Sequence, residues 1–267
     1  MTKISVSRIG LYADCSLKYK FRYVDKIEKP AVSVHLAYGS AIHSGLETIN
    51  KALIAGETID LSDVYQSFHS DYEKDLTTMG IENDYYRWTL YEMGLRTLEK
   101  YFYELIDYEP IASEIEFDVP LIWPNGEKCE THTLHGLIDV ILKRKNDLII
   151  MDYKTSKEPY KKFKLDTSIQ LGAYSYAFRQ LLSQDLFPQL KKKKEDYIAY
   201  CVILKNYDSE IVDIKTQRKA VTDVHIDRVL NIIQTVIMAE ANEIFIPNFE
   251  SSCNWCEYKK ECLVHEG

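Results

Sequence analysis

Hydrophobic residues recur at helical spacing through the first part of the chain. Ser7 is expected to cap a first helix that carries Ile9, Tyr12 and Leu17. Further helices are predicted at about residues 37–55, 61–76 and 83–106. The last of these places several large side chains on a single face: Tyr86, Leu90, Met93, Leu98 and Phe102. The first part of the chain is therefore predicted to be helical.

From Pro110 onward the pattern changes to that of β-strands. Extended runs are predicted at residues 111–123, in a second segment that ends in HGLIDVIL, and in LIIMDYKTS at 148–156. A turn at Pro124, Asn125 and Gly126 separates the first two runs. A helix at about 166–182, strands near 197–204 and 210–215, and a helix at about 223–241 follow. This order predicts an α/β core between a helical region and a cysteine-rich tail.

The composition is that of a globular protein. The 267 residues allow one large domain or two small ones, and 46% are hydrophobic and 28% charged, without repeats or low-complexity tracts. No run approaches the roughly 18 apolar residues of a membrane helix, and the opening MTKISVSRIG lacks a signal-peptide segment. We therefore expect a soluble, cytoplasmic protein without a membrane partner. The sequence leaves its oligomeric state open.

Charge is distributed unevenly along the chain. The net charge of −8 argues against binding of polyanions by the whole surface. Between Lys143 and Lys164, however, there are eight lysines and arginines and only three acidic residues. This stretch is either an ordinary solvated face or a local basic patch. The run KKKK at 191–194 is expected to be an exposed loop.

Two predicted strands place carboxylates opposite each other. HGLIDVIL and LIIMDYKT are separated only by KRKND, which favours an antiparallel hairpin. A turn centred between Lys145 and Asn146 sets Asp139 directly opposite Asp152, and Lys154 shares their face. Two carboxylates so close repel each other unless a cation lies between them, and Mg²⁺ accepts such oxygen ligands. The alternative is that Asp152 and Lys154 form a solvated strand end.

Other residues near these strands bear on the same chemistry. Lys154 beside a bound metal ion would orient or help to deprotonate an attacking water, or stabilise charge on a phosphate. Glu114 and Glu116 lie on the preceding strand. One of the two glutamates is a candidate to point into the site.

The motifs around these strands resemble those of a known enzyme family. HGLIDVI followed by IIMDYKTS is similar to the PD-(D/E)XK nuclease superfamily, in its RecB-like branch. YGSAIHSGLE matches the Gly-x-x-x-His of that branch with Gly39 and His43. SIQLGAYSYAF matches its Gln-x-x-x-Tyr with Gln170 and Tyr174. The match extends from residue 5 to residue 262, with a poorly matched stretch between about 54 and 108.

The resemblance implies a set of site residues. The implied metal ligands are His43, Asp139, Asp152 and the backbone carbonyl of Tyr153. Lys154 is implied to be the catalytic lysine. Gln170 and Tyr174, one helical turn apart, would support the site or contact nucleic acid. The expected metal ion is Mg²⁺ or Mn²⁺.

The resemblance also implies a fold. This is an α/β fold with a restriction-endonuclease-like core, in which helices flank a central mixed sheet. Residues 1–267 would form a single RecB-like nuclease domain. It would comprise a helical insertion at about 50–108, a catalytic α/β core at about 109–220, and a site at residues 15 and 253–262 that joins the two ends of the chain.

Six cysteines are present, and the tail CNWCEYKKEC spaces three of them as C-x₂-C-x₅-C: Cys253, Cys256 and Cys262. Disulfides are not expected in an intracellular chain. Cys129 and Cys201 fall in predicted strands, where free cysteines usually behave as small buried hydrophobes. Cys15 then supplies a fourth thiolate. Four thiolates suit structural zinc and an iron–sulfur cluster about equally.

The resemblance favours the cluster. RecB-like nucleases of the AddB type and CRISPR-associated RecB-like exonucleases carry one upstream cysteine and a C-terminal C-x₂-C-x₅-C that holds a [4Fe–4S] cluster. The implied cluster ligands are therefore Cys15, Cys253, Cys256 and Cys262, in a structural role. SVSRIGLYADCSLKYKFRYV resembles the opening of these proteins, although Ser16 stands where many have proline.

Together these features predict a metal-dependent DNA nuclease, most simply an exonuclease on single-stranded DNA or duplex ends. DNA is the expected partner, with the basic stretch from Lys157 to Lys164 near its backbone, and a helicase or a CRISPR integrase is a further candidate. The implied settings are recombination, repair, phage DNA processing and CRISPR adaptation. Two alternatives stay open: a cluster-bearing DNA-binding or assembly module without nuclease activity, and a zinc-stapled protein without catalysis.

Overall fold

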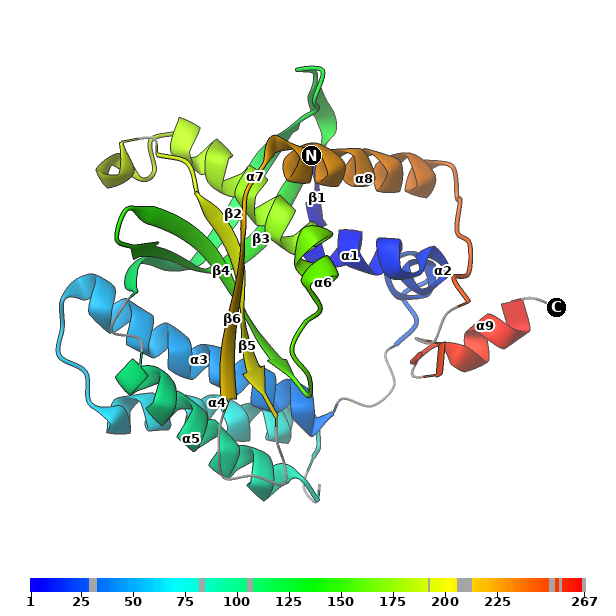
Figure 1. The fold of residues 1–267 in the computed structure, drawn as a ribbon. Helices are drawn as coiled ribbons and strands as arrows, with labels where there is room; N and C mark the ends of the chain where they lie inside the picture. Colours follow the sequence, from blue (N-terminus) through cyan, green and yellow to red (C-terminus); the bar gives the residue numbers. More distant parts are fainter. Residues whose placement is uncertain are drawn as a thin grey trace.

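The computed structural model describes residues 1–28, 33–81, 85–104, 108–191, 193–205, 213–249, 253–254 and 256–265. Its centre is a mixed six-stranded β-sheet (Figure 1). The strands are β1 (Thr2–Ser5), β2 (Glu109–Ile122), β3 (Lys128–Arg144), β4 (Asp147–Ser156), β5 (Tyr197–Leu204) and β6 (Asp213–Ala220). The long strand β3 pairs with β2 along one edge, and with β1 and then β4 along the other. β5 and β6 extend the sheet beyond β4.

Helices cover both faces of this sheet (Figure 1). On one face lie α3 (Val34–Ala55), α4 (Leu61–Thr78) and α5 (Arg87–Glu104). On the other face lie α1 (Val6–Asp14), α7 (Ile169–Ser183) and α8 (Asp223–Ala241). Shorter helices are α2 (Ser16–Tyr19), the π-helix η1 (Lys20–Val24), α6 (Lys162–Asp166), the 3₁₀-helix η3 (Pro188–Leu190) and α9 (Lys259–His265). This arrangement confirms the predicted mixed sheet flanked by helices.

The sheet separates two hydrophobic cores. Leu148 and Ile150 of β4 belong to the core that contains α7 and α8, whereas Ile149, Met151 and Tyr153 belong to the core that contains α3–α5. Successive side chains of a strand point to opposite faces, so a strand covered on both sides is apolar throughout. This explains the uninterrupted apolar run of β4.

The hairpin of β3 and β4 has the predicted register. Pairing begins beside the turn at residues 145–146 and continues to Val140 and Met151. There the ladder between the two strands ends, and β4 continues beside β5. The next residues along the two strands are Asp139 and Asp152. The two carboxylates therefore lie where β3 and β4 separate.

Several boundaries near the N-terminus differ from the prediction. Ser5 caps α1 in place of Ser7, because the Ser5 hydroxyl accepts a hydrogen bond from the backbone N–H of Arg8. Leu17 lies in α2, beyond the end of α1. The sequence pattern does not predict β1, since a four-residue strand that pairs with a distant part of the chain carries little local signal.

The remaining elements follow the predicted order. β5 and α8 have the predicted bounds. The helix predicted at about 166–182 is α7, which begins after its cap Ser168, and the short helix α6 precedes it. β6 spans 213–220 in place of 210–215, and residues 210–212 lie outside the described residues. The predicted helix at 83–106 is described as α5 over 87–104. Its outer residues 83–84 and 105–106 also lie outside the described part.

The N-terminal and C-terminal segments contact each other. The hydroxyl of Ser16 donates to the carbonyl of Ile246 at 2.9 Å and accepts from its N–H at 2.7 Å. Lys18 forms an ion pair of 2.7 Å with Glu257. A small buried cluster lies alongside and contains Leu17, Phe21 and Tyr258. These contacts hold the segment that carries Cys15 against the cysteine-rich tail.

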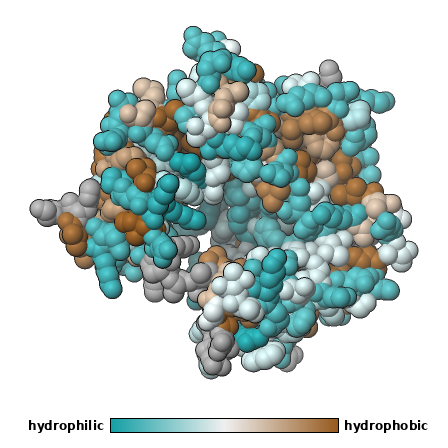
Figure 2. Space-filling view, turned by 180° about the vertical axis from the view of Figure 1, so that it is seen from behind, coloured by the Kyte–Doolittle hydropathy of each residue, from teal (hydrophilic) through white to brown (hydrophobic). Residues whose placement is uncertain are grey.

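The face opposite to that of Figure 1 is mainly polar. Seen from behind, it is mostly hydrophilic and is hollowed above the α3–α5 layer (Figure 2). Within the described ranges, no helix combines the length and the apolar character that crossing a bilayer requires.

Candidate active site

Two buried carboxylates lie where β3 and β4 separate. Asp139 is 6% exposed, and Asp152 is fully buried. Burial raises the pKa of both carboxyl groups, and the negative charge of Asp139 raises that of Asp152 further. Two such carboxylates destabilise the folded chain unless a cation or proton accompanies them. The pair therefore suits a site that binds a cation.

Lys154 lies beside Asp152. The Nζ of Lys154 is 2.5 Å from Oδ2 of Asp152, while Oδ1 of Asp152 has no hydrogen-bond partner among the described residues. Burial by itself lowers the pKa of Lys154, but the negative charges of Asp152 and Asp139 together with Tyr160 outweigh that effect, and the pKa lies above its ordinary value. Lys154 is therefore positively charged at neutral pH. One buried oxygen of Asp152 can accept a further ligand.

The backbone of Tyr153 connects β4 to two other site residues. Its N–H donates to Oδ2 of Asp139 at 2.7 Å, and its carbonyl oxygen lies 3.1 Å from Nε2 of His43. The buried Tyr153 hydroxyl accepts a hydrogen bond from Asn50 of α3 at 3.0 Å and lies 2.5 Å from the hydroxyl of Tyr101 of α5. The helical layer therefore fixes the position of the Tyr153 carbonyl.

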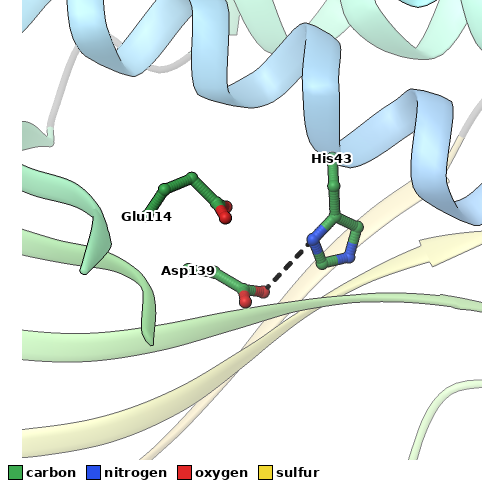
Figure 3. A group of neighbouring side chains, drawn as sticks. All are labelled: His43, Glu114 and Asp139. Atoms are coloured by element: carbon green, nitrogen blue, oxygen red, sulfur yellow. Dashed lines mark ion pairs between the residues drawn. The ribbon is translucent and has the colours of Figure 1, made fainter. Parts of the chain in front are cut away.

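Helix α3 carries His43 toward Asp139 (Figure 3). Nδ1 of His43 lies 3.6 Å from Oδ2 of Asp139. Burial lowers the pKa of the imidazole, although the charge of Asp152 opposes this effect. The ring is therefore neutral at pH 7, which is the form in which histidine binds metals.

Glu114 is a third carboxylate at this site. It points from β2 toward Asp139 and His43, and one ligand atom of each residue lies within 4.8 Å of the other two (Figure 3). Burial raises the pKa of Glu114 to about 7, with a further contribution from the charge of Asp139. The sequence indicates only that Glu114 or Glu116 faces the site. A left-handed φ of 51° at Glu114, unusual for this residue type, is the local feature that the pattern cannot predict.

A cavity of about 670 Å³ lies beside Asp139, between α1, β3 and α7. Gln170 and Tyr174 line it, and Nε2 of Gln170 donates to the Tyr174 hydroxyl at 2.8 Å. They lie one helical turn apart because they are four residues apart in α7, the helix that Ser168 caps. The structure thus places this pair beside Asp139, outside the group formed by His43 and the carboxylates.

The four cysteines of the predicted cluster site line a second cavity, of about 120 Å³: Cys15, Cys253, Cys256 and Cys262. All cysteines are free. Cys129 and Cys201 are buried in β3 and β5, as predicted for small hydrophobic residues. The structure therefore brings one N-terminal cysteine together with three from the tail.

Comparison with known proteins identifies the family. Residues 3–263 match the PD-(D/E)XK nuclease superfamily. The chain belongs to this superfamily. It is 25% identical to the Gene 69 protein of Mycobacterium phage L5 over 208 residues, which cover 65% of this chain and 69% of the phage protein. The Gene 69 protein of Mycobacterium phage D29 is 25% identical over 215 residues, or 71% of this chain and 76% of that protein.

Two further proteins are similar to this PD-(D/E)XK chain. An ATP-dependent helicase/deoxyribonuclease subunit of Carboxydothermus hydrogenoformans is 30% identical over 212 residues, which cover 69% of this chain but only 19% of that much longer protein. The crystal structure of a protein from Eubacterium rectale that carries an exonuclease assignment shares the fold, with a TM-score of 0.52 and 13% identity. That match covers 96% of this chain and 87% of the other. Family and fold together support a nuclease-like function.

PD-(D/E)XK nucleases use divalent metal ions, and the residues of this site fit one. Carboxylate and carbonyl oxygens are the preferred ligands of Mg²⁺, and Mn²⁺ accepts these and imidazole nitrogen. The site offers such groups, including the unpartnered Oδ1 of Asp152. A cation there would also relieve the repulsion between the buried carboxylates.

Proposed function

We propose that this chain is a metal-dependent deoxyribonuclease that acts as an exonuclease on single-stranded DNA or duplex ends. The observation that carries the proposal is the convergence of a charged lysine, Lys154, with buried carboxylates and a neutral imidazole where β3 and β4 separate. The proposed ligands of Mg²⁺ or Mn²⁺ are His43, Asp139, Asp152 and the carbonyl oxygen of Tyr153, with Glu114 as an additional carboxylate. A bound ion would supply Lewis acidity toward the scissile phosphate.

The chain's own residues supply the rest of the chemistry. Asp152 holds the Lys154 ammonium beside the carboxylates, where it can orient an attacking water or stabilise negative charge on a phosphate oxygen. The Tyr174 hydroxyl accepts a hydrogen bond from Gln170, so its own proton is free for donation to a DNA phosphate in the adjoining cavity. In the proposed reaction Gln170 and Tyr174 position the DNA strand.

DNA is the proposed substrate. The similarity to a helicase/deoxyribonuclease component supports DNA as the substrate and a helicase as a partner. DNA recombination or repair is the proposed setting. The basic residues that follow Lys154, among them Lys161 and Lys162, can neutralise backbone phosphates.

A [4Fe–4S] cluster bound by Cys15, Cys253, Cys256 and Cys262 is the proposed second cofactor, with a structural role. These cysteines share one cavity of about 120 Å³. This exceeds the roughly 10–15 Å³ that a single water-sized sphere needs. The space leaves room for a group larger than one ion. Such a group would reinforce the contacts between the two ends of the chain.

Cleavage of end-labelled single-stranded and duplex DNA by anaerobically purified protein tests the nuclease proposal. We expect cleavage with Mg²⁺ or Mn²⁺, none with EDTA, and a loss of at least about a hundredfold in Lys154→Ala and Asp139→Asn. Lys143→Ala, at the far end of β3, is the matched lysine control and should cleave like the wild type. If all variants and the wild type are equally inert while the folded protein binds DNA, the chain is a DNA-binding module.

A further inference from the structure

The segment that follows Lys154 presents an unusual aromatic side chain. Phe163, in the short helix α6, is 73% exposed. Single exposed hydrophobic residues are common on protein surfaces and need no function. Phe163, however, lies among Lys161, Lys162 and Lys164, which are all exposed.

This segment is connected to the candidate active site through Tyr160. The Tyr160 ring lies 5.2 Å from that of Tyr200, edge to face, and Tyr200 pairs with Asp152 across β4 and β5. Tyr160 also contributes to the electrostatic environment of Lys154. The Nζ of Lys164 lies 3.6 Å from the centre of the Tyr160 ring, a cation–π contact. Aromatic and basic side chains therefore extend from β4, which carries Asp152 and Lys154, to α6.

A cavity of about 440 Å³ lies at this position. It begins at Ser156, the last residue of β4, and its wall includes Tyr160, Lys161, Phe163 and Lys164. A hollow whose wall combines an exposed ring and two lysines with a single acidic residue, Glu158, suits an unpaired nucleotide, whose base has an apolar face and whose phosphate is negative. A paired base in a duplex has no free face for such a ring, except at the end.

We propose that Phe163 is a stacking platform for an unpaired base of single-stranded DNA, with Lys161 and Lys164 on the adjoining phosphates. The proposal rests on the nuclease function and specifies its substrate as a single strand that passes over α6. Phe163 is a positioning residue, because it would hold a nucleotide beside the site of cleavage without touching the reacting atoms. Its loss should weaken binding of single strands more than binding of covalently closed duplexes, which have no ends.

The test measures DNA binding by a variant that is expected not to cleave DNA. In the full-length Lys154→Ala protein with Mg²⁺, the affinity for single-stranded oligonucleotides carrying 2-aminopurine at successive positions is measured by fluorescence. Phe163→Ala should weaken binding about tenfold, which corresponds to about 1.4 kcal/mol. It should also remove the fluorescence quenching at one position. Phe163→Trp should keep the wild-type affinity and quenching. Phe163→Leu should keep neither, since leucine retains apolar area but has no ring face.

Tyr103→Ala is the matched control, because Tyr103 is also exposed, at 60%, but lies in α5 on the far face of the sheet. It should leave affinity and quenching unchanged. The proposal is overturned if Phe163→Leu binds like the wild type, or if Phe163→Ala weakens the binding of single strands and of covalently closed duplexes equally. Cleavage assays separate the two proposals. If the wild type cleaves DNA and Phe163→Ala binds single strands as the wild type does, only the stacking proposal is overturned. If the wild type does not cleave DNA but its binding depends on Phe163, only the nuclease proposal is overturned.

Discussion

Asp139 accepts a hydrogen bond of 2.7 Å from the backbone N–H of Tyr153, the residue that follows Asp152. This bond connects β3 and β4 just beyond the end of their ladder. It fixes the Asp139 carboxylate in a position where its charge raises the pKa of both Asp152 and Glu114. The hydrogen bond from Tyr153 therefore holds Asp139 close to Asp152 and Glu114 although the three carboxylates repel one another.

Replacing Asp139 with asparagine should stabilise the protein in EDTA at pH 8. An asparagine oxygen can still accept the hydrogen bond from Tyr153, but the repulsion toward Asp152 and Glu114 is removed. We expect a gain of about 1–3 kcal/mol in the free energy of unfolding, measured by urea denaturation. Added Mn²⁺ should stabilise the wild type but leave Asp139→Asn nearly unchanged.

The sign of the pH dependence follows from the raised pKa values. A carboxyl group whose folded-state pKa exceeds its unfolded value of about 4 binds more protons in the folded state, so stability falls as pH rises. In EDTA the wild type should lose stability between about pH 4 and pH 7, the value to which burial raises the pKa of Glu114. Asp139→Asn should flatten this decline, and Glu130→Gln, on the exposed surface, should not. Parallel curves for all three proteins would contradict the electrostatic account.

The sequence predicts Asp139, Asp152 and Lys154 together because a two-residue turn fixes the register of a hairpin, and register determines which side chains share a face. It cannot distinguish Glu114 from Glu116, since the choice depends on a left-handed residue within β2. Nor does it reveal β1, whose partners lie far along the chain. Features fixed by local geometry are thus accessible from sequence, whereas those created by tertiary contacts are not.

Glu114→Gln should weaken the binding of Mn²⁺ by at least about tenfold, because it removes a carboxylate that lies with Asp139 and His43. Glu116→Gln is the matched control, since Glu116 lies two residues away on the same strand and lines the larger cavity. Isothermal titration of the folded protein with Mn²⁺ measures both affinities. Equal affinities in the two variants would remove Glu114 from the metal site.

Replacing both Lys161 and Lys162 with alanine should reduce the salt dependence of single-stranded DNA binding. Each phosphate contact contributes about 0.7 to the slope of log K against log salt, so the slope should fall by up to about 1.4. The double variant Lys191→Ala, Lys194→Ala removes the same charge from an exposed loop and should keep the wild-type slope. The slopes of the variants and the wild type are measured by fluorescence anisotropy over a range of salt concentrations. An unchanged slope in the first variant would show that these lysines do not contact DNA.

Cys256→Ser should abolish cluster binding, because it removes one of the four thiols that share the cavity at the two ends of the chain. We expect loss of iron and of the broad absorbance near about 400 nm, and a decrease in Tm of more than about 5 °C. The variant should remain folded, since the hydrogen bonds between Ser16 and Ile246 and the ion pair of Lys18 with Glu257 persist.

Cys129→Ala is the control for cluster loss, because Cys129 is buried in β3 and does not line this cavity. It should keep the iron and the absorbance even if removal of the sulfur lowers Tm through lost packing. The comparison therefore separates ligation from packing, which Tm alone cannot do. Zinc without absorbance near about 400 nm in the anaerobically purified wild type would identify the site as a zinc staple. Iron retained by Cys256→Ser would exclude that thiol as a required ligand.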